Sequence, residues 1–156
     1  MSDLDILNQT LAVEHIGIAA YDAALGTGLL GGPTADAARA FRSDHVRHGE
    51  LIVEQIVARG GTPVSPRDPA DYAKAYPPLN TEADIVAYAI ELEAGATRSY
   101  VASVAQYEDR SLALLGAEIG AVEAQHWAVL LAASGANPVP SPIIEVMGGT
   151  SKMTAA

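Results

Sequence analysis

The chain of 156 residues contains no cysteine. This absence excludes disulfides, thiolate zinc sites, iron–sulfur clusters and cysteine nucleophiles. Basic residues are also scarce, because nine Lys and Arg stand against 19 Asp and Glu, for a net charge of -10. Since nucleic-acid affinity depends on clustered cationic side chains, we expect no nucleic-acid partner.

Long apolar runs are missing from the amino-terminal segment MSDLDILNQTLAVEH, which is acidic and has no basic region. The segment therefore lacks the pattern of a secretory signal or a membrane span, and we expect a cytoplasmic protein with no membrane partner. No Ser-His-Asp array, phosphate-binding loop or glycine-rich nucleotide fingerprint is evident in the chain either. These motifs offer no support for a hydrolase or a nucleotide-binding enzyme.

The composition that remains, 49% hydrophobic and 18% charged, is typical of a well-packed globular domain. Apolar residues recur at alternating steps of three and four, which predicts amphipathic helices. There are four such stretches. The first covers about residues 3–25, the second begins after Pro33 and ends at Gly60, the third covers about 82–107, and the fourth begins at about 112 and ends at Gly135. The prediction is an all-α fold in which Ser2 and Thr81 cap the first and third helices.

Two proline-rich segments separate or follow these helices. Five of the nine prolines lie in residues 62–80, which predicts an extended crossover about as long as a helix of roughly 38 Å. Short connections within each helix pair predict two antiparallel hairpins joined by that crossover. We predict one bundle over residues 1–136, followed by an irregular tail of Pro and Gly over 137–156.

The two hairpins repeat each other in their polar core positions. Glu14 and Tyr21 on the first helix correspond to Glu93 and Tyr100 on the third, with an offset of 79 residues in each case. The second and fourth helices follow the same rule with an offset of 78 residues, which relates His45 and His48 to Glu123 and His126. Four polar positions that coincide in this way indicate a duplicated plan.

Burying a carboxylate without a partner costs roughly several kcal/mol of folding free energy. A ring of Glu and His side chains that face the core therefore needs a compensating charge, and a metal ion supplies one. Residues three apart on a helix share a face, so His45 with His48, or Glu123 with His126, can approach one ion or two adjacent ions. One Glu from each of two helices, with Glu-x-x-His from the others, is a pattern of di-iron and di-manganese bundles. The predicted metal ligands are Glu14, His45, His48, Glu93, Glu123 and His126.

These residues resemble the ligands of the ferritin-like superfamily, in particular the bacterioferritin and rubrerythrin type and small bacterial ferritin-like domains. The resemblance covers about residues 3–135 and implies a ferritin-like four-helix bundle. It implies two iron ions, with manganese or zinc as alternatives, and oxidation of Fe(II) by oxygen or peroxide. Glu14 and Glu93 would be terminal ligands, Glu123 a bridge, and His48 and His126 would bind one ion each.

His45 departs from the family pattern, which has a second bridging Glu at this position. A neutral imidazole does not span two cations as a carboxylate does, so three outcomes stay open. His45 binds one metal end-on, the centre holds a single ion, or the chemistry of the bundle has lapsed. Asp44 is a candidate substitute, although its position is rotated partly off the core face.

Other features of the relatives are missing. Without cysteine there is no rubredoxin-like centre, and Val46 stands where a haem-binding methionine would lie. The alternative function is a non-enzymatic ferritin-like scaffold or a stress-related protein with a degenerate or mononuclear site. The resemblance also implies a homodimer, for which the candidate contacts are Leu29, Leu30, Ile143 and Ile144.

Two further groups of residues carry expectations about packing. Tyr21 and Tyr100 are predicted to fill the core and to bond the carboxylates through their hydroxyls. Four glycines inside helices each cost roughly 1 kcal/mol relative to Ala, so we expect them to allow close helix approach or to leave room for the site. They are Gly17, Gly95, Gly116 and Gly120.

Overall fold

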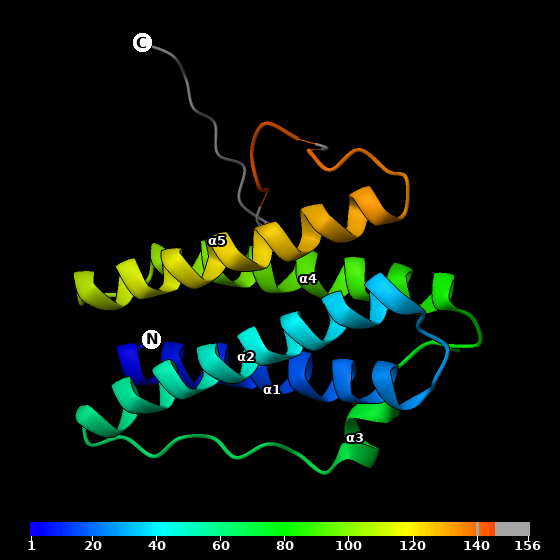
Figure 1. Ribbon diagram of the computed structural model, residues 1–156. Coiled ribbons are helices and arrows are strands. Elements are labelled where there is room, and N and C mark those ends of the chain that lie inside the picture. Colours follow the sequence, from blue (N-terminus) through cyan, green and yellow to red (C-terminus); the bar gives the residue numbers. More distant parts are fainter. Residues whose placement is uncertain (140, 146–156) are drawn as a thin grey trace.

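The computed structural model describes residues 1–139 and 141–145. Its elements are α1 (Asp3–Gly26), α2 (Gly32–Ala58), α3 (Pro69–Ala73), α4 (Glu82–Val104) and α5 (Arg110–Ala133). Figure 1 shows α1 and α2 as one antiparallel hairpin lying along a second hairpin made of α4 and α5. The described part of the chain contains no strand, so the predicted all-α bundle is confirmed.

The helix ends follow local backbone chemistry. Ser2 and Thr81 accept hydrogen bonds from the backbone N–H groups of Asp5 and Asp84, whose carboxylates bond back, so both predicted caps are confirmed as capping boxes. After α2 and α5, Gly60 (φ 73°) and Gly135 (φ 79°) adopt the left-handed conformation that stops a helix. The third predicted helix was too long, because α4 ends at Val104 and the chain turns before Asp109 caps α5.

The crossover runs back along the first hairpin, below α2 in Figure 1, before the chain enters α4. The short helix α3 interrupts it, because Asp68 accepts a hydrogen bond from Ala70 N–H and Pro69 occupies the first turn. This single turn agrees with the expectation that the segment holds no long helix. Residues 137–139 and 141–145 form no helix, and the rest of the predicted irregular tail lies outside the described residues.

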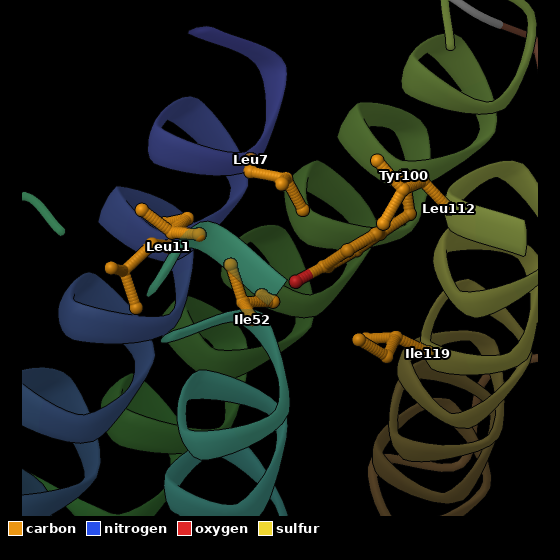
Figure 2. Close-up of a cluster of buried hydrophobic side chains, with 7 residues drawn as sticks. Leu7, Leu11, Ile52, Tyr100, Leu112 and Ile119 are labelled. Atoms are coloured by element: carbon orange, nitrogen blue, oxygen red, sulfur yellow. The ribbon is translucent and has the colours of Figure 1, made fainter. Parts of the chain in front are cut away.

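Two apolar clusters fill the bundle on either side of its middle. One contains seven buried residues, namely Leu7, Leu11, Ile52, Ile56, Tyr100, Leu112 and Ile119 (Figure 2). The other contains Tyr21, Ala38, Phe41, Ala89 and Leu130. Each cluster therefore includes one of the paired tyrosines, whose rings are apolar and whose hydroxyls face the polar centre between the clusters.

Candidate metal centre

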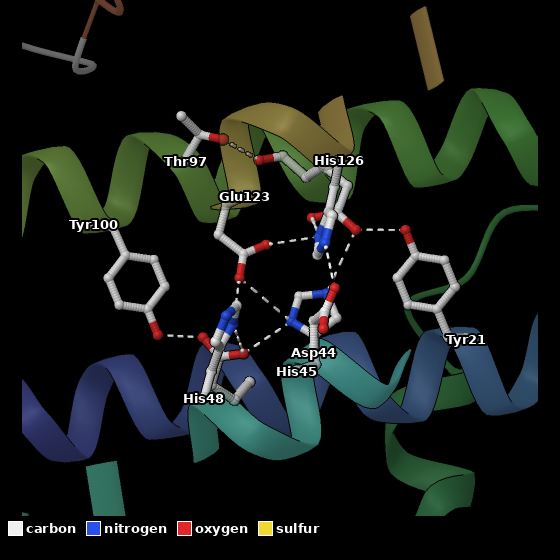
Figure 3. Close-up of polar contacts among 10 residues, drawn as sticks. Tyr21, Asp44, His45, His48, Thr97, Tyr100, Glu123 and His126 are labelled. Atoms are coloured by element: carbon white, nitrogen blue, oxygen red, sulfur yellow. Dashed lines mark hydrogen bonds and ion pairs between the residues drawn. The ribbon is translucent and has the colours of Figure 1, made fainter. Parts of the chain in front are cut away.

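All six predicted ligand residues converge in the middle of the bundle. Three of them are Glu14 on α1, Glu93 on α4 and Glu123 on α5, each with 0% exposure. The three histidines, His45, His48 and His126, are between 0 and 6% exposed. In Figure 3 the side chains of His45 and His48 on α2 point toward those of Glu123 and His126 on α5.

The cluster divides into two half-sites that share two residues. The first half-site consists of Glu14, His45, His48 and Glu123, and the second consists of His45, Glu93, Glu123 and His126. Within each half-site the candidate ligand atoms all lie within 4.8 Å of one another. The shared residues face both ways, because Glu123 directs Oε1 toward His48 Nδ1 at 2.9 Å and Oε2 toward His126 Nδ1 at 3.5 Å.

His45 lies opposite Glu123 and also faces both half-sites. Its Nδ1 is 2.8 Å from Glu14 Oε2, and its Nε2 is 3.4 Å from Glu93 Oε1. The structure thus brings His45 into the centre at the position of the missing bridging Glu. An imidazole that keeps one N–H has a lone pair for only one half-site at a time.

The structure places Asp44 outside this ring of six. Its carboxylate is half exposed, and its Oδ2 lies 3.1 Å from His126 Nε2, on the side of the imidazole away from the cluster. A carboxylate in this position accepts the Nε2–H proton and leaves Nδ1 free to face an ion. Asp44 therefore orients His126 in this structure, whereas it had been considered as a substitute ligand.

Two tyrosines close the cluster at its ends. The Tyr21 hydroxyl on α1 donates to Glu93 Oε1 on α4, and the Tyr100 hydroxyl on α4 donates to Glu14 Oε1 on α1. The predicted tyrosine–carboxylate bonds are therefore present, and each joins the two hairpins. Burial, followed by the adjacent carboxylate, raises the pKa of both phenols well above the usual value, so they stay protonated and donate.

The neighbouring carboxylates favour the protonated form of all three histidines. Burial alone would lower the pKa of His45, but contacts with Glu14 and Glu93 outweigh it and raise that pKa to about 11. The same opposition between burial and carboxylate contacts raises the pKa of His48 and of His126 to about 9. Burial likewise would raise the pKa of Glu14 and Glu93, but their histidine contacts lower it.

Unsatisfied polar atoms provide the test of whether these residues fit a metal. Among the described residues, the buried side-chain atoms without a hydrogen-bond partner are all in this cluster: His48 Nδ1, His126 Nδ1, Glu93 Oε2 and both oxygens of Glu123. His48 Nδ1 and Glu123 Oε1 are only 2.9 Å apart, yet they do not have hydrogen-bond geometry. Ligands at roughly 2.1 Å from one ion would stand about 3.0–3.4 Å apart, so the spacing and the orphaned atoms fit a metal ion.

Two of the four helical glycines make room at or near the centre. A Cβ on Gly17 would lie 2.8 Å from three atoms of the His45 ring, and one on Gly120 would lie 2.9 Å from Tyr100 Cβ. A Cβ on Gly116 would be in ordinary contact range of Tyr107, at 3.4 Å, and a Cβ on Gly95 would meet nothing within 4 Å. The packing expectation is therefore confirmed for Gly17 and Gly120 and wrong for Gly95.

A cleft of about 790 Å³ lies between α1 and the crossover. Its lining includes His15, Ile18, Arg67 and Tyr72, and it contains none of the six cluster residues. Because the six are nearly inaccessible, the cluster suits ions and very small molecules rather than an organic substrate.

Comparisons with known proteins agree with this geometry. A family model described as a ferritin-like domain matches residues 2–136, so the chain belongs to the ferritin-like domain family. A similar solved structure is that of a conserved hypothetical protein, rv2844, from Mycobacterium tuberculosis, with 17% identity and a TM-score of 0.72. The similarity covers 83% of this chain and 94% of that one and concerns the fold alone. None of the curated proteins matches this chain.

Proposed function

We propose that this protein binds iron in the buried cluster and oxidises Fe(II) with oxygen or peroxide. The observation that carries the proposal is the set of five orphaned ligand atoms on four of the six cluster residues. Carboxylate oxygens and imidazole nitrogens are ligands that iron accepts, and manganese or zinc would accept the same set. The fold adds to this support because its family places metal sites in the core of the bundle.

The reaction that we propose has Fe(II) as its reductant. Two Fe(II) ions each give one electron to O2, which takes up two protons and leaves as H2O2. With peroxide as the oxidant, two Fe(II) and two protons convert H2O2 into two waters. The chain contributes Glu14, Glu93 and Glu123 as oxygen ligands and His48 and His126 as nitrogen ligands, and the apolar clusters around them exclude bulk water.

Metal content tests the binding step. Protein purified from iron-supplemented cells should carry iron, and the Glu93→Ala, Glu123→Ala double variant should carry almost none. Equal transition-metal content in the two proteins would overturn the proposal. Stopped-flow absorbance of ferric iron after Fe(II) and oxygen are mixed with the wild type then tests oxidation separately.

A second function, a non-enzymatic scaffold or stress-related protein with a degenerate site, is favoured by one observation. The cluster has three acidic and three basic side chains, and His45 Nδ1 already contacts Glu14 at 2.8 Å. Such a cluster can balance its own charge without an ion. Wild-type protein that stays metal-free after iron loading, yet is folded and melts cooperatively, would favour this second function.

The proposal extends to a homodimer in the cytoplasm. The structure has no helix, within its described residues, that is long and apolar enough to cross a membrane. Leu29, Ile143 and Ile144 are exposed and remain candidate dimer contacts. Leu30, by contrast, is half-buried against the second apolar cluster, so it is not the exposed contact that a dimer surface at this loop would need. Light scattering coupled to size-exclusion chromatography tests the dimer.

A further inference from the structure

We infer that the two half-sites are unequal and that the second half-site, made of His45, Glu93, Glu123 and His126, takes the first metal ion. This inference rests on the proposed metal binding and goes beyond it, because it states which half of the cluster is prepared for an ion. The preference follows from hydrogen bonds that occupy both oxygens of the Glu14 carboxylate in the first half-site and leave one oxygen of Glu93 free in the second.

The terminal carboxylates differ in how many oxygens are occupied. Both oxygens of Glu14 already accept hydrogen bonds, one from the Tyr100 hydroxyl and one at 2.8 Å from His45 Nδ1. Glu93 accepts from the Tyr21 hydroxyl through Oε1, and its Oε2 has no hydrogen-bond partner. An ion in the second half-site therefore meets a free carboxylate oxygen, whereas an ion in the first must displace a hydrogen bond.

The two hydrogen-bond distances of His45 reinforce the difference. The 2.8 Å contact of Nδ1 with Glu14 is in the normal range of an N–H···O hydrogen bond, whereas the 3.4 Å contact of Nε2 with Glu93 is longer than that range. The shorter hydrogen bond therefore holds a proton on Nδ1, against Glu14. An imidazole gives up a proton when it binds an ion, and His45 would do so at Nε2, the nitrogen that faces the second half-site.

The remaining histidines also differ in their support. Asp44 accepts from His126 Nε2 at 3.1 Å, which fixes the tautomer that presents Nδ1 to Glu93 and Glu123. At the position that corresponds to Asp44 in the repeat, 78 residues later, the chain has Val122, which offers no such acceptor to His48. The second half-site therefore has two imidazole nitrogens and two carboxylates ready for one ion, with His126 oriented from behind.

Titration with Co(II), using protein that carries no histidine tag, tests the order of filling. Binding is followed by calorimetry and by the visible absorption of Co(II), which reports its coordination. We expect one tight equivalent in the wild type and a second that is weaker by at least about tenfold. Glu93→Gln should weaken the tight equivalent by about 100-fold or more, whereas the matched variant Glu14→Gln should change it by less than about tenfold.

Two further variants probe the support of the second half-site. Asp44→Asn, in which the amide cannot reproduce the charged acceptor, should weaken the tight equivalent by about 10-fold to 100-fold. His45→Glu restores a second carboxylate bridge and should bring the second equivalent close to the first in affinity. Melting temperatures and circular dichroism establish that each variant folds.

The possible outcomes separate this inference from the proposed function. Two equivalents of equal affinity, or a tight equivalent that Glu14→Gln removes and Glu93→Gln spares, would overturn the inference and leave metal binding intact. No binding by the wild type would overturn both. Should the Glu93 variant fail to fold, anomalous scattering from a wild-type crystal soaked in Co(II) decides instead, because the inference requires the stronger peak to lie between Glu93 and His126.

Discussion

The α1–α2 and α4–α5 hairpins are two versions of one plan, and they differ where they meet the centre. Each supplies a terminal Glu, a Tyr that bonds the other hairpin's Glu, and a His. The hairpins diverge at the shared position, which is His45 in the first and Glu123 in the second. A symmetric scaffold therefore surrounds an asymmetric centre.

The divergence extends to a residue that packs on the shared position. Gly17 on α1 lies against the His45 ring, and the corresponding residue on α4, 79 positions later, is Ala96. An imidazole is bulkier than a carboxylate, and the absent Cβ of Gly17 provides its space. The contact of His45 with Gly17 indicates that the surrounding helix leaves space for an imidazole at this position, where a bridging Glu would be smaller.

The largest expected effect comes from removing Glu123, one of the two residues that both half-sites share. Glu123→Ala leaves His48 and His126 without the carboxylate that they both face, at 2.9 and 3.5 Å. Breaking a buried charge cluster in this way costs about 3–5 kcal/mol, so metal-free protein should lose that much unfolding free energy in urea. Glu118→Ala, an exposed change on the same helix, is the control and should have almost no effect. A similar loss in both variants would contradict this role of Glu123.

The paired tyrosines should be equivalent in the two hairpins. Tyr21→Phe and Tyr100→Phe each remove a hydrogen bond to a buried carboxylate, and each should lower the unfolding free energy of metal-free protein by about 1.5–3 kcal/mol. Tyr88→Phe on α4 is the matched control, since Tyr88 is half-buried and its ring packs against Tyr76 instead of a buried carboxylate. Unequal losses in the two variants would show that the hairpins differ in more than their shared position.

Gly17→Ala tests the accommodation of His45. In an ordinary helix interior this change stabilises, but here the new Cβ would meet the His45 ring at 2.8 Å, so we expect a loss of about 1–3 kcal/mol. In a His45→Ala background the same change should cost far less. A double-mutant cycle from urea unfolding measures this coupling, and strict additivity would show that the ring and Gly17 are independent.

The smallest expected effect concerns an ion pair that joins the two hairpins, between the end of α2 and the start of α5. Arg59, after α2, lies 2.6 Å from Asp109, which caps α5, and hydrogen bonds from Ser111 and then Arg59 lower the pKa of Asp109 to about 2. Because this folded pKa lies below the ordinary value of about 3.8, the contribution is present above pH 4 and is lost as the pH falls toward 2.

Asp109→Asn removes this ion pair alone, because Asn still caps the helix but carries no negative charge for Arg59. The variant should melt a few °C below the wild type at pH 7, and the difference should vanish near pH 2. A difference that persists unchanged at pH 2 would mean that the pair with Arg59 is not its cause.

Much of the fold could be predicted from the chain because helical patterning and capping are local. Ser2 and Thr81 indicate the starts of α1 and α4, because each forms a capping box with an Asp three positions later. The glycines at 60 and 135 mark the ends of α2 and α5. The end of α4 was less predictable, since apolar periodicity continues to Tyr107 while the chain already turns at Ala105. That turn depends on where the partner helix α5 must begin.

The candidate site was partly predictable for the same reason. Residues that repeat at a constant offset and share a helix face must converge when the hairpins pack, and the six do converge. The pairing of each tyrosine with the opposite hairpin's Glu could not be inferred, because it depends on how the hairpins are aligned. The role of Asp44 was equally hidden, since its contact with His126 joins residues 82 positions apart.

The sequence by itself determined which residues form the candidate site and which faces of the helices they occupy, because a period of 3.6 residues is a property of the local backbone. Only the tertiary structure decided which oxygen and nitrogen atoms are already bonded and which are left free. That distinction arises between helices, at distances of a few ångströms set by the packing of the two hairpins, and it makes the halves of a repeated sequence unequal.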